Sequence, residues 1–145
     1  MRIAVMADTH NHFPPTLPAQ VSEADEIWHL GDVCDADTLV EFERLGRPLR
    51  IVLGNNDHHS AWPVALGIEK EGHHFLLTHI PPQHPPAGVR IVLHGHTHVP
   101  RDETIGDVRW LNPGCVSFAG RGAPPSFAWL TLLRGEKPGW VIVQL

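Results

Sequence analysis

The chain has little cysteine and no tyrosine: Cys34 and Cys115 are the two cysteines among 145 residues. Two isolated cysteines cannot form the framework of several disulfides that small secreted domains need, and we expect both thiols to be reduced. Cys34 follows Asp32 closely enough to join a soft metal site, but a buried small side chain is the favoured interpretation. A disulfide-rich secreted scaffold is therefore excluded.

Long apolar runs are also lacking. The first run, Ile3 to Ala7, ends at Asp8 and is too short for the core of a signal peptide. No run approaches the roughly 18 apolar residues of a transmembrane helix. We therefore expect a cytoplasmic protein that does not partner a membrane.

Runs of basic residues are absent as well. The 11 lysines and arginines are scattered, and the formal net charge is −5, so no electrostatic footprint for extended nucleic acid is visible. Length and the 42% hydrophobic content indicate one globular domain over residues 1–145. A small anionic substrate is compatible with this composition, and a homo-oligomer remains open.

What the chain does have is a recurring pattern in which an apolar run ends at candidate metal ligands. The run Ile91 to Leu93 ends at His94, and an extended backbone then sends His96 and His98 to one side. Four other runs end similarly, at Asp8-Thr9-His10, Gly31-Asp32, Gly54-Asn55-Asn56-Asp57 and Thr78-His79. Because ligands of open α/β sheets bind beyond the carboxyl ends of strands, these ends are expected to meet in one crevice.

The order of elements predicts the α/β class with two sheets. Strands at 2–7, 26–30 and 49–53 alternate with helices at about 17–24 and 35–45, which favours a parallel sheet covered by helices. Later short runs predict a second, largely antiparallel sheet packed on the first and burying three tryptophans. These runs are 64–71, 75–78, 90–93, 104–111, 127–133 and 140–145, and the tryptophans are Trp110, Trp129 and Trp140.

Seven residues are candidate metal ligands: Asp8, His10, Asp32, Asn55, His79, His96 and His98. Gly54-Asn55 would pass for an ordinary turn pair in isolation, but its position after a strand favours a ligand. If two ions divide the set with Asp32 between them, the remaining positive charge favours a phosphate group. Mixed imidazole, carboxylate and amide ligands suit manganese, iron, zinc, cobalt or nickel.

The same motifs, in the same order, resemble those of the calcineurin-like metallophosphoesterases. Over residues 1 to about 115 the chain is most similar to small bacterial and archaeal phosphodiesterases, which share a loop like Asn112-Pro113-Gly114. The resemblance implies a four-layer sandwich of two β-sheets flanked by helices. It also implies two divalent transition-metal ions, manganese first among them. Asp8, His10, Asp32 and His98 would hold one ion, and Asp32, Asn55, His79 and His96 the other.

The activity implied by the resemblance is hydrolysis of a small phosphate ester, a diester in preference to a monoester. The nucleophile would be a hydroxide between the metals, with Asp32, His10 and Asn55 as catalytic residues. The alternatives are a phosphomonoesterase and a catalytically inactive interaction module such as a retromer subunit of the same fold. A nuclease would need a basic groove that the composition does not indicate.

The chain departs from the family pattern at three places. Asn56 stands where many members have a histidine that assists the leaving group, and Cys115 replaces a serine. Residues 80–86 are proline-rich where a helix is common. Among the residues outside the ligand set, we expect Asp57 to orient a ligand histidine and His29 and His94 to support the site. The remaining histidines are expected in loops: His12, His58, His59, His73, His74 and His84.

Overall fold

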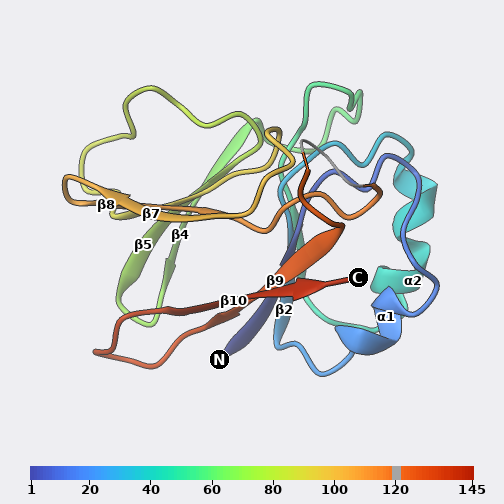
Figure 1. Ribbon diagram of the computed structural model, residues 1–145, viewed down its shortest axis with the longest axis horizontal. Coiled ribbons are helices and arrows are strands. Elements are labelled where there is room, and N and C mark those ends of the chain that lie inside the picture. Colours follow the sequence, from blue (N-terminus) through green and yellow to red (C-terminus); the bar gives the residue numbers. More distant parts are fainter. Residues whose placement is uncertain (119–121) are drawn as a thin grey trace.

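The computed structural model describes residues 1–118 and 122–145, which fold into two five-stranded sheets packed face to face (Figure 1). The first sheet has the order β10-β9-β1-β2-β3 and the second the order β4-β5-β6-β8-β7. Strands of the first sheet are β1 (Arg2–Met6), β2 (Glu26–His29), β3 (Leu49–Ile51), β9 (Ser126–Thr131) and β10 (Gly139–Gln144). Strands of the second are β4 (Ala65–Lys70), β5 (His73–Thr78), β6 (Ile91–Leu93), β7 (Arg101–Ile105) and β8 (Val108–Asn112).

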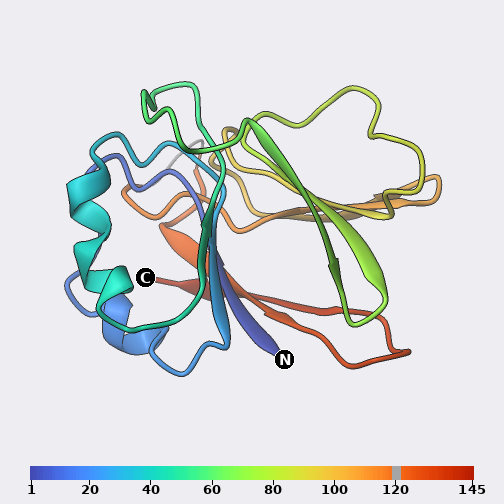
Figure 2. The ribbon, with the colours of Figure 1, turned by 180° about the vertical axis from the view of Figure 1, so that it is seen from behind.

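Short helices cover the outer face of the first sheet (Figure 2). They are α1 (Leu17–Gln20) and a 3₁₀ turn at Ala36–Leu39 that continues into α2 (Val40–Glu43). Both are shorter than predicted. Pro18 lies in the first turn of α1, and the side chain of Asp35 caps the 3₁₀ turn by accepting from the backbone N–H of Asp37.

Alternation along the strands produces two apolar layers. Ile3, Val5 and Ala7 face the second sheet, whereas Ala4 and Met6 face the helices. A third, smaller cluster of Leu76, Val92 and Trp110 lies on the other face of the second sheet, where Val89 and Val108 pack on it. The predicted α/β sandwich is confirmed, with helices on one of its outer faces.

The structure corrects the assignment of the last strands. Strands β9 and β10 join the first sheet, where β9 pairs antiparallel with β1. The second sheet is mixed, because β5, β6 and β8 are parallel and only its edge pairs are antiparallel. The single strand predicted at 104–111 is part of the hairpin β7–β8, whose turn includes Gly106 with φ 58°.

The tryptophans also lie elsewhere than expected. Trp110 and Trp129 are buried, but Trp129 faces the helices and Trp110 the third cluster. Of these three tryptophans, Trp140 packs, half-buried, against the core between the sheets. Among the described residues no helix is long and apolar enough to cross a membrane.

Candidate metal centre

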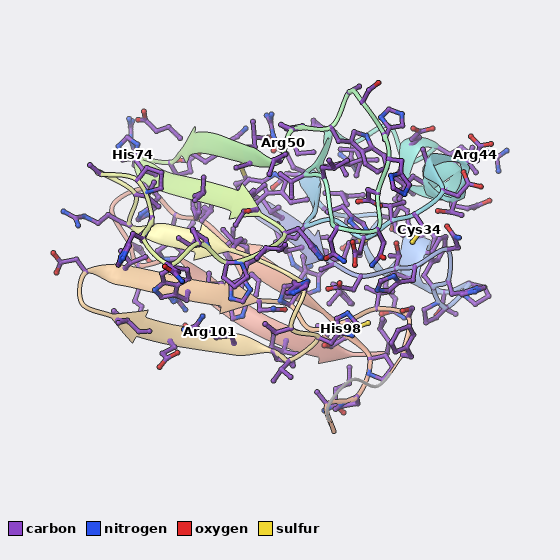
Figure 3. All side chains as sticks on the ribbon, turned by 90° about the horizontal axis from the view of Figure 1, so that it is seen from above. Cys34, Arg44, Arg50, His74, His98 and Arg101 are labelled. Carbon is purple, nitrogen blue, oxygen red and sulfur yellow. The ribbon has the colours of Figure 1, made fainter. Side chains whose placement is uncertain are left out.

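The site lies where parallel strands of both sheets end at a common edge. Asp8 follows β1, Asp32 follows β2 and Asn55 follows β3, while His79 and His96 follow β5 and β6. The backbone ties these ends together, because the N–H of Asp8 donates to Gly31 and that of Gly95 to His79. Figure 3 shows the side chains from above and labels His98, on the loop after β6, and Cys34, on the loop after β2.

Two overlapping groups of three could each hold an ion: Asp8 with His10 and His98, and Asp8 with Asp32 and His79. Oδ1 of Asp8 is 3.2 Å from Nε2 of His98 and 3.8 Å from Nε2 of His10. Oδ2 of Asp32 is 3.4 Å from Nε2 of His79 and 3.8 Å from Nε2 of His10. Asp8 therefore belongs to both groups, and Asp32, a member of the second group, also lies near His10 of the first.

Asn55 and His96 complete the cluster. Oδ1 of Asn55 lies 2.9 Å from Nε2 of His79 and 2.9 Å from Nδ1 of His96. The N–H of His96 donates to Oδ2 of Asp8 over 3.2 Å. The structure thus brings all seven predicted residues together, and their role as ligands remains a prediction.

The arrangement of His79 fits a cation. Its Nδ1–H donates to the carbonyl of Leu30 over 2.8 Å, so a neutral ring presents the lone pair of Nε2 to the cluster. That lone pair faces the oxygen of Asn55 and the carboxylate of Asp32, and three acceptors in contact need a proton or a metal ion between them.

Unpartnered buried atoms lead to the same conclusion. Oδ1 of Asp8 and Nε2 of His10 are buried without a hydrogen-bond partner. Burying such atoms alone is costly, and a coordinated divalent ion would satisfy both. The donors, carboxylate and imidazole, are those that bind transition metals.

The backbone here adopts a conformation that is unfavourable for residues with a side chain. Five of the seven candidates have left-handed φ values: Asp8 57°, His10 45°, Asp32 58°, His96 67° and His98 60°. Such conformations cost of order 1–3 kcal/mol each and cluster at functional sites, where surrounding contacts enforce them. The loops after β1, β2 and β6 are therefore shaped for the site rather than for local stability.

Asp57 fixes the backbone of the loop after β2 and of its own loop after β3. Its Oδ2 accepts from the N–H of Asp32 (2.9 Å) and of Gly54 (2.8 Å), and its Oδ1 accepts from the N–H of Cys34 (2.7 Å). The expectation that Asp57 orients a ligand histidine was wrong. Because the two loops pack closely on Asp57, both of its carboxylate oxygens accept from backbone N–H groups rather than from an imidazole.

Two buried histidines contact residues next to the candidate ligands, as predicted. Nε2 of His29 contacts Oγ1 of Thr9 (3.1 Å), and Nδ1 of His29 accepts from the N–H of Gly31 (3.2 Å). His94 packs beside Gly95, with its Nδ1 3.0 Å from that carbonyl. Burial lowers the pKa of both rings to about 4, so both are neutral near pH 7.

Two residues with a place at the site were not identified from the sequence. The fully buried Asn112 donates to the carbonyl of Gly95 (2.9 Å) and to Oγ1 of Thr97 (3.1 Å). It thereby fixes the loop that carries His96 and His98. Phe118, half exposed, lies against His10 and His98 with ring centroids 5.6 Å away in both cases. The Asn112-Pro113-Gly114 motif could have indicated the role of Asn112. The sequence contains no comparable motif around Phe118.

The cysteines are both free. Sγ of Cys34 lies 3.8 Å from Nδ1 of His10, beside the cluster rather than in either candidate group. Sγ of Cys115 is buried and donates to the carbonyl of Asp8 (3.3 Å), which Oγ of Ser117 also contacts (3.0 Å). Cys115 thus supports the loop after β1, and a serine could make the same contact.

The two carboxylates differ in acidity. Burial raises the pKa of Asp8 to about 7, and the nearby charge of Asp32 adds to the effect against the opposing charge of His79. Burial also acts to raise the pKa of Asp32, but hydrogen bonds from His79 and Asn56 outweigh it and hold that pKa well below the ordinary range. For His79, burial alone would lower the pKa, but contact with Asp32 raises it overall.

Metal binding should therefore weaken as the pH falls below 7. Below its pKa of about 7, Asp8 carries a proton that a metal ion must displace, and the raised pKa of His79 acts in the same direction. Each displaced proton lowers the apparent affinity by about tenfold per pH unit. Calorimetric titration with Mn²⁺ at about pH 6 and about pH 8, in two buffers of different ionisation enthalpy, measures both affinity and proton release. Equal affinities without proton release would contradict the assignment of Asp8.

Comparisons with known proteins agree with this geometry. The model of the calcineurin-like phosphoesterase superfamily domain matches residues 1–135. A phosphodiesterase of Methanocaldococcus jannaschii is 29% identical over 143 residues, covering 81% of this chain and 86% of the relative. The structure of YfcE, a phosphoesterase from E. coli, is 25% identical with a TM-score of 0.78, covering 90% of this chain and 88% of YfcE.

A more distant structure shares the fold alone. Vps29 from Entamoeba histolytica, complexed with Zn²⁺, is 21% identical with a TM-score of 0.79, covering 99% of this chain and 98% of Vps29. Since the family match spans most of the sequence and the fold agrees throughout, the chain belongs to the calcineurin-like phosphoesterase superfamily.

Proposed function

We propose that the protein is a dinuclear metal-dependent phosphoesterase that hydrolyses small phosphodiesters in preference to monoesters. The observation that carries this proposal is the convergence of the candidate ligands, five of which form two overlapping groups that include two buried atoms without partners, Oδ1 of Asp8 and Nε2 of His10. The phosphodiesterase of M. jannaschii supports the same class of reaction.

In this proposal Asp8, His10 and His98 would hold one ion, His79, Asn55 and His96 would hold the other, and Asp32 would be a ligand of both. When bound, two divalent ions supply a hydroxide nucleophile near neutral pH and positive charge for the phosphate, and manganese suits the mixed donors. Asp32 remains ionised because its pKa is held low. Asp57 and Asn112 keep the loops in place through the backbone contacts described above.

Asn56 contributes to the site by a contact that the sequence does not reveal. Its Nδ2–H donates to Oδ2 of Asp32 (2.7 Å) and its backbone N–H to Oδ1 of Asp32 (2.8 Å). An amide cannot act as a general acid, and here it is already committed to orienting the carboxylate. The departing oxygen of the substrate therefore receives no proton from this position.

The rate should consequently depend steeply on the pKa of the leaving group. General acid catalysis contributes about 10²–10⁴-fold, so aryl diesters should be cleaved well and alkyl diesters poorly. The measurement is kcat/KM over a series of diesters that spans leaving-group pKa. Asn56→His should accelerate the poorest leaving groups most when compared at equal metal content. A flat series for the unmodified protein would mean that another acid is already present.

The proposal is tested by metal analysis of the untagged protein together with parallel assays on bis(4-nitrophenyl) phosphate and 4-nitrophenyl phosphate. We expect two transition-metal ions per chain and faster turnover of the diester. Two firmly bound ions without turnover of any ester would instead favour a non-catalytic interaction module. Preferred turnover of the monoester would overturn the diester assignment alone.

A further inference from the structure

Two cavities lie beside the metal cluster, and residues of the segment 54–63 line both. One cavity, of about 460 Å³, is lined by Asn56, His58 and His59 of this segment together with Asn11, Cys34 and Asp35. The other, of about 260 Å³, is lined by Leu53, Gly54 and Asn55 together with Val64, Thr78 and Ile80. His79 also lines the second cavity. The first cavity reaches the cluster through Cys34, which contacts His10, and Asn56, which donates to Asp32.

The segment 54–63, which contributes lining residues to both cavities, is held by backbone hydrogen bonds. The N–H of Leu53 donates to the carbonyl of Pro63 (2.8 Å) and closes the segment at its base. Within it, the N–H of Asp57 donates to Gly54 (3.2 Å) and the N–H of Trp62 to His59 (3.2 Å). Two consecutive residues at its start contact the cluster, Asn55 through His79 and His96, and Asn56 through Asp32.

The larger cavity offers groups for hydrogen bonding. Five of its seven lining residues carry amide, imidazole or carboxylate side chains. Asp35 uses one oxygen to cap the 3₁₀ turn, and Asn11 uses its side-chain oxygen to accept from the N–H of Asp35 (2.8 Å). Their remaining atoms are free to meet hydroxyl groups. The negative charge of Asp35 disfavours an anionic occupant.

The smaller cavity is lined mainly by apolar atoms. Val64 is 69% exposed and Ile80 52% exposed, although both are large aliphatic side chains. Of its polar side chains, Thr78 donates through Oγ1 to the carbonyl of Ile80 (3.2 Å), and Oδ1 of Asn55 faces Nε2 of His79 (2.9 Å). An aliphatic occupant would cover the exposed side chains of Val64 and Ile80.

We propose that the protein acts on asymmetric phosphodiesters, with a hydroxyl-bearing substituent in the larger cavity and a short alkyl substituent in the smaller one. The inference rests on the proposed function, because it places the phosphate between the cavities at the metal cluster. A diester has two substituents on phosphorus and a monoester has one, so two flanking cavities match a diester. Hydrolysis adds the oxygen of water to phosphorus, breaks one P–O ester bond and gives the released alcohol a proton, leaving a monoester.

Binding to the Mn²⁺-loaded protein tests the inference independently of turnover. The probes are di-n-propyl phosphate, bis(2,3-dihydroxypropyl) phosphate and the mixed diester, which differ only in hydroxyl groups. We expect calorimetry to give the mixed diester the lowest Kd, by about tenfold against each symmetric diester. Equal binding of all three, or a preference for either symmetric diester, overturns the inference.

Paired variants assign each cavity. Val64→Asp should weaken binding of the mixed and di-n-propyl diesters by about tenfold and spare the dihydroxypropyl diester, because a charge disfavours an alkyl group. Val141→Asp, at a 60% exposed position on β10, is the matched control and should leave the binding of all three diesters unchanged. His58→Leu should weaken the two hydroxylated diesters, and His84→Leu in an exposed loop is its control. Variants that affect all three probes equally contradict the assignment.

The outcome separates this inference from the proposed function. If the unmodified protein turns over bis(4-nitrophenyl) phosphate while the three probes bind equally, only the asymmetric preference fails. If it turns over no ester while the mixed diester binds most tightly and the variants behave as expected, the assignment of the two substituents to the two cavities stands and the catalytic proposal fails.

Discussion

Asp32→Asn is expected to abolish retention of two metal ions and to lower diester turnover by more than about 100-fold, since changes at residues that merely support metal ligands already cost about 10–100-fold. Asp32 is 2% exposed, and its Oδ2 lies within 3.8 Å of both His10 and His79. Asparagine has almost the same shape but carries no charge. Its NH₂ group would also meet one of the two N–H donors of Asn56, so the substituted side chain loses both attraction and fit.

The metal-loaded variant should also unfold more easily. Ions that bind only the folded state add about 2.7 kcal/mol at a hundredfold excess over Kd, and this contribution would be lost. The measurement is Tm with and without Mn²⁺, together with metal content and kcat/KM. Asp107→Asn removes an equal charge from a site whose side chain is 85% exposed and should alter none of these. An Asp32→Asn protein that keeps two ions and normal turnover would show that Asp32 does not join them.

Gly54→Ala is the second substitution expected to have a large effect. A Cβ atom at position 54 would lie 2.1 Å from the backbone nitrogen and 2.2 Å from Oδ1 of Asp32. Relief requires the loop after β2 to move, and that loop is also tied to Asp57. We expect the free energy of unfolding to fall by about 1–3 kcal/mol, as overpacking does, and metal affinity to fall with it.

Gly67→Ala is the matched control, because a Cβ atom there has nothing within 4 Å. Chemical denaturation of the metal-free proteins measures the packing effect, and Mn²⁺ titration measures the effect on the site. If Gly54→Ala matches Gly67→Ala in both, the close approach of the two loops is not needed for metal binding.

The candidate site could be predicted from the sequence because each candidate ligand closely follows a strand in the chain. An apolar run fixes a strand, and the polar residue that follows it, such as Asp8 or His79, necessarily lies at the strand's carboxyl end. The role of Asp57 could not be read in this way. Its acceptors serve N–H groups of Asp32 and Cys34, and sequence spacing does not show which loops pack together.

The misplaced strands have a similar cause. Both faces of β9 are buried, with Leu130 toward the second sheet and Trp129 toward the helices, which is typical of a strand inside a covered sheet. Its pairing partner β1 is almost a full chain length away. The pattern of apolar residues reveals that a strand exists. It does not reveal which strand pairs with it, because that depends on which strand edge is unpaired in the rest of the fold.

The position of β1 between β2 and β9 imposes an order on folding. During synthesis β1 can pair with β2 early, but its other edge stays open until Ser126–Thr131 leaves the ribosome. Until then the strand that leads to Asp8 exposes backbone donors and acceptors that invite pairing with other chains. Contacts between the two ends of a chain also slow folding, since the loop between them must close first. Refolding yields should therefore depend on protein concentration, and the metal centre should be among the last features to form.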